Sequence, residues 1–198
     1  MKRIISFTLL IALLSISWTG CSPKREVKRI DSDTQTDLSG RWNDTDSRMV
    51  ADAMVSQILG GKWLERYKNK HDGKRPVLIV GLVKNKTHEH ISSQTFIKDI
   101  EKAIINDGSA RLVQAGSKRN ALREERSDQQ DFASSKSAKE WGLELGADFM
   151  VHGDINSIVD SYRDEKVVYY QTNLELSNLQ TNEIVWIGDK KIKKFIEN

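Results

Sequence analysis

The single cysteine of the chain, Cys21, is the residue whose surroundings point most directly to chemistry. Two basic residues at the start of the chain precede an apolar stretch, Ile4–Ile16, and the small residues Thr19 and Gly20 stand just before the cysteine. This is the layout of a secretory signal peptide: a basic start, an apolar centre and small residues at the cleavage site. A cysteine immediately after the small pair is typical of a bacterial lipobox, in which the thiol accepts a diacylglycerol and the chain is cut before it. We therefore expect Cys21 to be the lipidated N-terminus of the mature protein.

One residue departs from the usual lipobox, because Trp18 stands where Leu, Val or Ile is common. The alternatives are an ordinary signal peptide or a short membrane anchor that carries an incidental cysteine. The apolar run is shorter than the roughly 20 residues that a transmembrane helix needs. The residue after the cysteine, Ser22, is not the Asp that favours retention in the inner membrane of many diderm bacteria. The sequence thus predicts an outer-membrane lipoprotein whose domain faces the periplasm.

Histidines offer the best case for a metal site, and the case is weak. His88, Glu89 and His90 are adjacent, and His71 or His152 could join them. A strand would be needed to place the first two histidines on one face, whereas the stretch reads as a polar loop. The sequence also contains neither a phosphate-binding loop nor a G-x-S-x-G nucleophile motif. We therefore expect no metal, no cofactor and no enzymatic activity, with a metal-binding or hydrolytic protein as a remaining alternative.

Charge and length limit the classes of partner and the number of domains. The formal net charge of the whole chain is +3, and removal of residues 1–20 takes away Lys2 and Arg3, which lowers it to +1. A nearly balanced chain gives no general attraction to nucleic acid. Lack of a second cysteine excludes an intramolecular disulfide and a cysteine-based zinc site. We predict a signal peptide over 1–20, a lipidated flexible tether over 21–39 and one domain, expected to be monomeric, over 40–198.

The first half of that domain shows helix and strand signals in alternation. Asn43 or Asp44 can cap a helix whose apolar residues recur at helical spacing until Gly60 and Gly61. The continuous apolar run 77–83 predicts a strand that is covered on both faces. A second helix begins after Ser92 or Ser93, and Gly108 suits its left-handed C-terminal position.

The second half ends in strands. A short strand is expected over 110–114, a charged surface helix over 118–131, and a further helix over 137–146 that opens with the capping-box pattern Ser-x-x-Glu. Breaks at 163–165 and 178–182 then separate three strands that form an antiparallel meander. The predicted fold is α/β (α+β): a single domain with a mixed sheet of about five strands and helices packed on it.

Four lysines near the C-terminus allow two interpretations. They could contact an anionic surface, or they could protect the edge of a sheet from pairing with other strands. We favour edge protection. The four residues are Lys190, Lys191, Lys193 and Lys194.

Several short stretches are distinctive when they are taken together in order and spacing. They are residues 38–48, 83–87 with 90–91, 121–126, 145–150, 174–179 and 181–186. Together they resemble the LpoB family of lipoprotein activators of penicillin-binding proteins, and the resemblance runs from about Leu38 to Lys194.

The resemblance implies a domain like the N-terminal domain of TolB, carried on a lipid and a flexible segment. It also implies a partner, a bifunctional peptidoglycan synthase (class A penicillin-binding protein), whose glycosyltransferase and transpeptidase activities the lipoprotein stimulates. Members of the family have no catalytic residues of their own. The alternative that we keep is a structural accessory lipoprotein of another envelope assembly, such as a secretion or flagellar complex.

For the surface that contacts the partner, polarity and position favour two segments. The first is the loop 84–91, and the second is the charged segment 119–128. The predicted partner-binding residues are Asn85, Lys86, Thr87, His88 and Glu89 in the loop, and Arg123, Glu124 and Arg126 in the charged segment.

Overall fold

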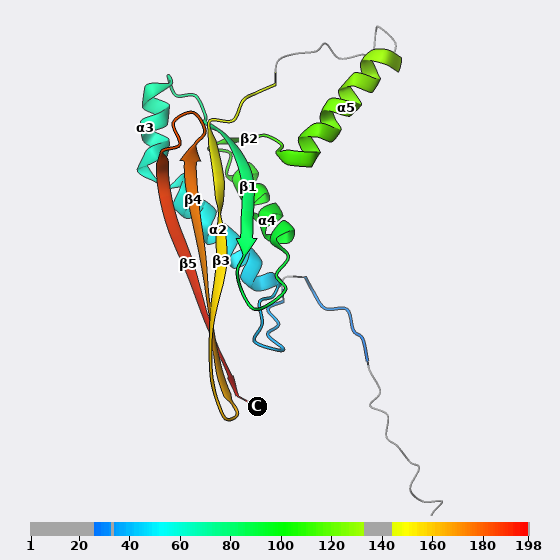
Figure 1. Ribbon diagram of the computed structural model, residues 1–198, viewed down its shortest axis with the longest axis vertical. Coiled ribbons are helices and arrows are strands. Elements are labelled where there is room, and N and C mark those ends of the chain that lie inside the picture. The colour runs from blue at the N-terminus through cyan, green and yellow to red at the C-terminus, as the bar shows by residue number, and fades with distance from the viewer. Residues whose placement is uncertain (1–25, 33, 133–143, 198) are drawn as a thin grey trace, which may run out of the picture. The chain divides into compact units, whose positions relative to one another are not determined.

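The computed structural model describes residues 26–32, 34–132 and 144–197 (Figure 1). Contacts divide the chain into two units, Met1–Thr34 and Gln35–Asn198. The described part of the first unit is exposed coil, with one turn in which the Thr34 N–H donates to the Asp31 carbonyl at 3.1 Å. All helices and strands described below belong to the second unit.

Helix α2, Asp44–Leu59, begins with the cap that the sequence predicts. The Asn43 side chain accepts a hydrogen bond from the Asp46 N–H at 3.0 Å, and the Asp46 carboxylate accepts one from the Asn43 N–H at 2.9 Å. This reciprocal capping box satisfies two of the backbone donors that a helix leaves free at its start. Val50, Met54 and Ile58 are fully buried, and the helix ends at Gly60 as expected.

Two further helices follow the same logic. In α3, Lys62–Lys70, the Trp63 ring lies against Phe149, and its Nε1–H donates to the Ile58 carbonyl at 2.6 Å. This packing places Trp63 at the C-terminal end of α2. Helix α4, Ser93–Asp107, is capped by Ser92 and ends at Gly108, whose φ of +74° is the left-handed conformation that glycine adopts without strain.

Five strands form one mixed sheet in the order β2-β1-β3-β4-β5. Strand β1 runs parallel to β2 and to β3, whereas β3, β4 and β5 form the predicted antiparallel meander. The architecture predicted from the sequence, a single domain with a mixed five-stranded sheet and helices packed on it, is therefore confirmed. The bounds are β1 Val77–Asn85, β2 Arg111–Leu112, β3 Phe149–Tyr162, β4 Glu165–Asn178 and β5 Ile184–Glu197.

The sequence predicts that both faces of β1 are buried, and this prediction is wrong. Ile79 is only partly buried and Leu82 is 59% exposed, although Leu78 and Val83 are fully buried. Helices α2 and α4 pack on each other and on the same side of the sheet, so one face is covered and the other is open (Figure 1). The continuous apolar run reflects the position of β1 between two neighbouring strands, and it does not indicate a second layer of helices.

The open face is easiest to follow in β4, the strand between β3 and β5. From Val167 to Ser177 its residues alternate between partly buried and buried, with Tyr170, Leu174 and Leu176 fully buried on the helix side. Gly153 of β3 must be glycine here, because a Cβ would lie 2.0 Å from the Asn173 carbonyl oxygen. The core is thus a single layer between the sheet and the two helices.

Helix α5, Gly116–Phe132, is the charged surface helix that the sequence predicts, and most of its side chains are exposed. The predicted helix over 137–146 falls largely outside the described residues, which resume at Glu144. Its capping-box pair, Ser137 and Glu140, lies outside them too.

Candidate functional site

The loop after β1 is held together by its own polar side chains. Asn85 Oδ1 accepts hydrogen bonds from the Thr87 N–H at 2.9 Å and the Thr87 hydroxyl at 2.8 Å, and Asn85 Nδ2 donates to the Glu89 carbonyl at 2.7 Å. The loop conformation therefore depends on Asn85 and Thr87, because the side chains replace backbone partners that a strand would supply. Both residues were predicted to bind a partner, and the structure shows them engaged within the loop.

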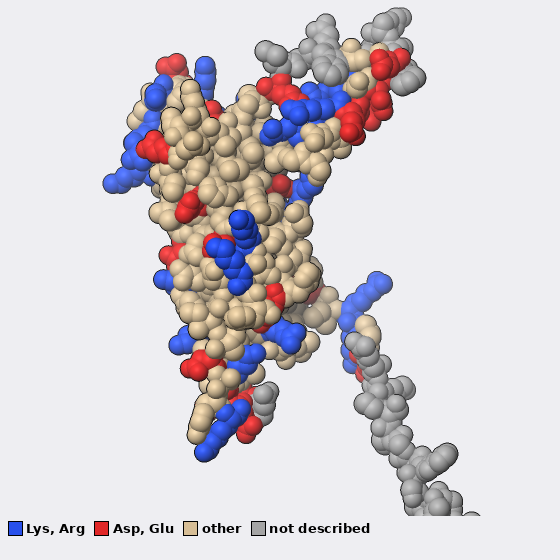
Figure 2. Space-filling model, in the orientation of Figure 1, with Lys and Arg blue, Asp and Glu red and all other residues tan. Residues whose placement is uncertain are grey.

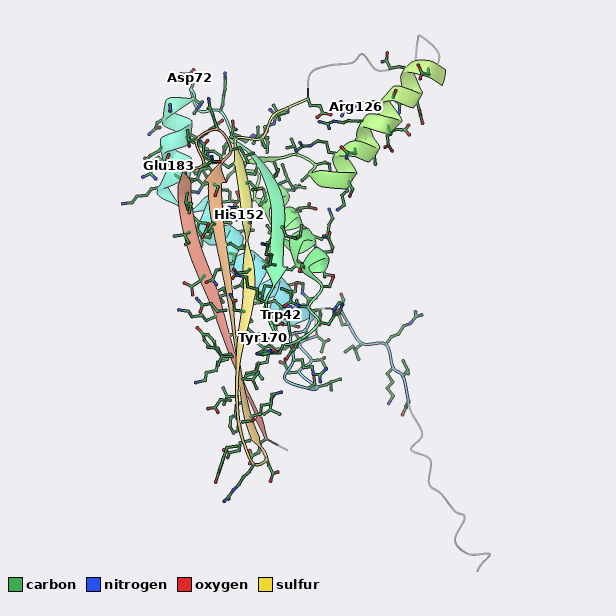
Figure 3. The ribbon with its side chains drawn as sticks, in the orientation of Figure 1. Trp42, Asp72, Arg126, His152, Tyr170 and Glu183 are labelled. Carbon is green, nitrogen blue, oxygen red and sulfur yellow. The ribbon has the colours of Figure 1, made fainter. Side chains whose placement is uncertain are left out.

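The Glu89 carboxylate points inward and connects three parts of the domain. It accepts a hydrogen bond from the Trp42 N–H at 3.1 Å and another from the Tyr170 hydroxyl at 2.8 Å. Trp42 packs edge-on against Tyr170 and Phe96, with ring centroids 5.5 and 6.3 Å apart (Figure 3). Burial and the hydrogen bond to Glu89 raise the pKa of Tyr170. Glu89 thus fixes the loop against the core.

Lys86 extends the loop onto the open face of the sheet. Its Nζ lies 2.7 Å from Asp154 Oδ2, while Asn156 and Asn173 donate to Asp154 Oδ1 at 2.5 and 3.1 Å. Burial alone would raise the pKa of Asp154, but the hydrogen bonds from Lys86, Asn173 and Asn156 hold it below its ordinary value. Gln171 joins the network by donating to Asn173 at 2.9 Å. We call this set of five residues the polar centre.

The histidines lie in separate environments. His88 is exposed in the loop, and its N–H donates to the Ser157 hydroxyl at 3.4 Å. His152 Nε2 and Ser177 Oγ lie 2.8 Å apart on β3 and β4, and His71 stacks on Tyr67. In the part of the chain that the structure describes, no group of three or more His, Cys, Asp or Glu side chains could hold a metal ion.

The charged helix α5 has its own ion pairs. Arg123 donates to both carboxylate oxygens of Glu144 at 3.0 and 2.8 Å, and Arg126 adds a third hydrogen bond at 2.6 Å (Figure 3). The hydrogen bond from Arg123, with that from Arg126, lowers the pKa of Glu144 to about 2. Glu124 is exposed. The two predicted contact segments are separate features, since the loop follows the end of β1 and α5 follows β2, which pairs with the start of β1.

The point where the tether enters the domain contains an ion cluster that the sequence did not reveal. Lys194 Nζ lies 2.7 Å from Asp37 Oδ1 and 2.6 Å from Asp46 Oδ2, and it also donates to the Arg41 carbonyl at 3.1 Å. Only 11% of the Lys194 side chain is exposed. Of the four lysines predicted to protect the sheet edge, all lie on the edge strand β5, but Lys194 points inward and does not protect the edge.

Beside α3 lies a hollow of about 690 Å³. The Asp148 carboxylate at its base accepts hydrogen bonds from the Tyr67 hydroxyl at 2.8 Å and the Val77 N–H at 2.7 Å. Burial, together with the hydrogen bond to Asp148, raises the pKa of Tyr67 to about 12. Asp148 therefore joins α3 to the start of β1, which is a structural role.

The residues of the predicted lipidation site, Cys21 with Thr19 and Gly20, lie outside the described residues. Within the described residues, none of the helices is both long enough and apolar enough to cross a bilayer.

Comparison with known proteins gives a family and several similar structures. A family profile described as peptidoglycan-synthase activator LpoB matches residues 46–192. No curated protein matches the chain. Among solved structures, the LpoB C-terminal domains of Salmonella enterica and Escherichia coli are 19% and 21% identical, and each covers 75% of this chain and 99% of its own, with a TM-score of 0.42. The lipoprotein GNA1162 of Neisseria meningitidis is 12% identical, with 61% and 83% covered and a TM-score of 0.40.

The family profile spans the domain from the capping box of α2 to the second half of β5. Its description gives the chain the general role of a regulator of peptidoglycan synthesis in the cell envelope. By this match, the chain belongs to the LpoB family.

Proposed function

We propose that this chain is a lipid-anchored, non-enzymatic regulator that binds and activates a class A penicillin-binding protein. The observation that carries the proposal is the LpoB profile over residues 46–192, which covers the folded domain from α2 to β5. The Cys21 pattern supports the anchor.

The proposed mechanism is a shift between two states of the synthase. A regulator without catalytic groups can raise activity only if it binds the active conformation more tightly than the inactive one. A tenfold shift in that equilibrium corresponds to about 1.4 kcal/mol of differential binding, which a modest interface can supply. The lipid anchor at Cys21, in the outer membrane and facing the periplasm, restricts where the regulator meets the synthase.

The test is glycan polymerisation by the purified bifunctional synthase of the same cell, with and without the purified chain. The substrate is the lipid-linked disaccharide precursor. We expect the initial rate to rise several-fold and to saturate with the concentration of the chain. An unchanged rate at saturating concentrations, for every bifunctional synthase of that cell, would refute activation. Recovery of secretion or flagellar components by crosslinking in cells would then favour the structural-accessory alternative.

A further inference from the structure

The open face of the sheet has the size of a protein interface. Strands β3, β4 and β5 have 14 residues each and β1 has nine. With a rise of about 3.3 Å per residue and a spacing of about 4.8 Å between strands, these four strands outline about 800 Å². A standard stable interface buries about 800 Å² on each partner. In Figure 2 the upper part of this face is turned toward the viewer, and uncharged residues cover most of it.

Apolar side chains occupy one end of this face. Ile79, Met150, Ser177 and Ile184 are register neighbours across four strands and form one row. Ile184 is 52% exposed, and Ile187 on the same strand is 65% exposed. Ser177 and Glu175 of β4 separate the apolar pair Ile79 and Met150 from Ile184 and Ile187. Single exposed apolar residues are ordinary on protein surfaces, but several gathered at one end of an open face favour a contact site.

A second apolar group lies at the other end, near the β3–β4 turn. Ile158 pairs with Tyr169, and Val167 pairs with Phe195 on the next strand. Ile158 is 66% exposed and Phe195 is 61% exposed, and Tyr162, on the same face, is 68% exposed. The burial alternation of β4 places this group on the same face as the first, because residues two apart along a strand share a face.

Between the two groups lies the polar centre. Its charged pair, Lys86 and Asp154, is internally neutral, and the neighbouring amides of Asn173 and Gln171 are already oriented by hydrogen bonds. On β5 the register partners of these amides are Asp189 and Lys191, which form a second ion pair. An ordered centre of this kind lowers the side-chain entropy that binding would otherwise cost. Its surface would hydrogen-bond a polar partner, while the apolar groups at both ends would contribute most of the affinity.

We propose that this open face is the docking surface for a folded domain of the activated synthase. The inference rests on the proposed function, and it assigns to that function a surface other than the loop or α5. The matching surface of the synthase carries apolar side chains at two ends and amide or hydroxyl groups between them. A second copy of this chain is the competing occupant. In a symmetric face-to-face pair the polar centre would meet the same residues of the second copy.

The test compares three substitutions that introduce the same charge at nearly the same exposure. Ile187→Arg and Ile158→Arg alter the two ends of the open face. Ile105→Arg is the matched control, because Ile105 is 62% exposed on α4, which packs on the covered side of the sheet. Each full-length variant is checked for its unfolding temperature, and is then titrated against the purified bifunctional synthase while glycan polymerisation is measured.

We expect each open-face substitution to raise the concentration needed for half-maximal activation at least tenfold, while Ile105→Arg matches the wild type. Wild-type activation by both open-face variants would overturn the docking surface and leave the proposed function intact. If the wild-type chain does not activate, the proposed function itself fails. Light scattering measures whether a second copy of the chain occupies the face. A wild-type dimer that Ile187→Arg converts to a monomer would assign the face to a second copy and overturn the inference.

Discussion

Glu89 illustrates how a polar loop residue can serve the interior of a domain. In the sequence it stands between two histidines in a polar stretch, which favours solvent exposure. In the structure its carboxylate receives one hydrogen bond from the Trp42 backbone and one from the Tyr170 hydroxyl. Both donors depend on this carboxylate, because a buried donor without an acceptor has lost its hydrogen bonds to water without replacement.

Glu89→Gln tests this role. Glutamine keeps the shape, but its amide offers one acceptor oxygen for the two donors, so either Trp42 or Tyr170 loses its partner. We expect the free energy of unfolding in urea to fall by about 1–3 kcal/mol. Glu124→Gln on the exposed surface of α5 is the control, and it should change stability by less than about 0.5 kcal/mol. Equal stability of the two variants would show that the Glu89 hydrogen bonds contribute nothing net.

Cys21→Ala tests the lipid anchor at the level of one thiol. If the thiol accepts the lipid, the variant incorporates no labelled fatty acid in growing cells, and its membrane-bound fraction decreases. Ser22→Ala is the control, because it leaves the thiol in place and should be labelled like the wild type. Labelling of the Cys21→Ala variant would place the modification elsewhere and refute the lipobox interpretation.

At the scale of elements, the sequence was informative wherever a local rule decides the outcome. The Asn43 cap, the Gly108 terminus and the three-strand meander follow from side-chain hydrogen bonds, backbone conformation and alternation, which act within a few residues. Structural features that depend on residues far away in the sequence could not be predicted in this way. The apolar run 77–83 could not show which side of β1 the helices would cover. The inward turn of Lys194 depends on Asp37 and Asp46, roughly 150 residues earlier.

Lys194→Met tests the cluster that joins β5 to the start of α2. Methionine retains much of the length and apolar volume, but it leaves the Asp46 carboxylate, whose side chain is 5% exposed, without a cation. Removing one partner of a buried pair costs about 3–5 kcal/mol in other proteins, and we expect a loss in unfolding free energy near the lower figure because Asp46 keeps its capping-box hydrogen bond. Lys191→Met, on the same strand but exposed, is the control and should lose little.

The same cluster predicts a pH dependence. Its hydrogen bond from Lys194 lowers the pKa of Asp37 below the ordinary value of 3.8. A carboxylate with a lowered pKa contributes stability that is complete above the ordinary value and is lost as the pH falls through the folded-state pKa. We therefore expect the unfolding free energy to decline below pH 3.8, and the decline to be shallower in Asp37→Asn. An identical acid limb in the variant and the wild type would remove Asp37 from the explanation.

At the scale of the whole molecule, the tether and the docking face together limit where the domain can act. Asp37 and Gly40 lie against β5, through Lys194 and Ile196 respectively, so the folded unit begins near Gln35. If Cys21 carries the lipid, the 13 residues 22–34 separate it from that point, and a chain of this length spans at most about 45 Å at full extension. On the proposed function, the synthase domain that binds the open face can then lie no farther from the lipid than this span plus the width of the folded domain.

Deletion of Glu26–Asp31 tests this restriction on reach. It leaves seven tether residues, which span at most about 25 Å. We expect the deletion to leave activation of the purified synthase in detergent unchanged, because the docking face and the Lys194 cluster are intact. In cells that depend on the chain, the same deletion should abolish its function.

Replacing the six residues with Gly and Ser at equal length is the control and should preserve function, because length and not composition sets the span. If the deletion variant functions in cells, the synthase comes close enough to the membrane for the shortened tether to reach it. A loss of activation in detergent would instead place part of the docking surface in the tether itself.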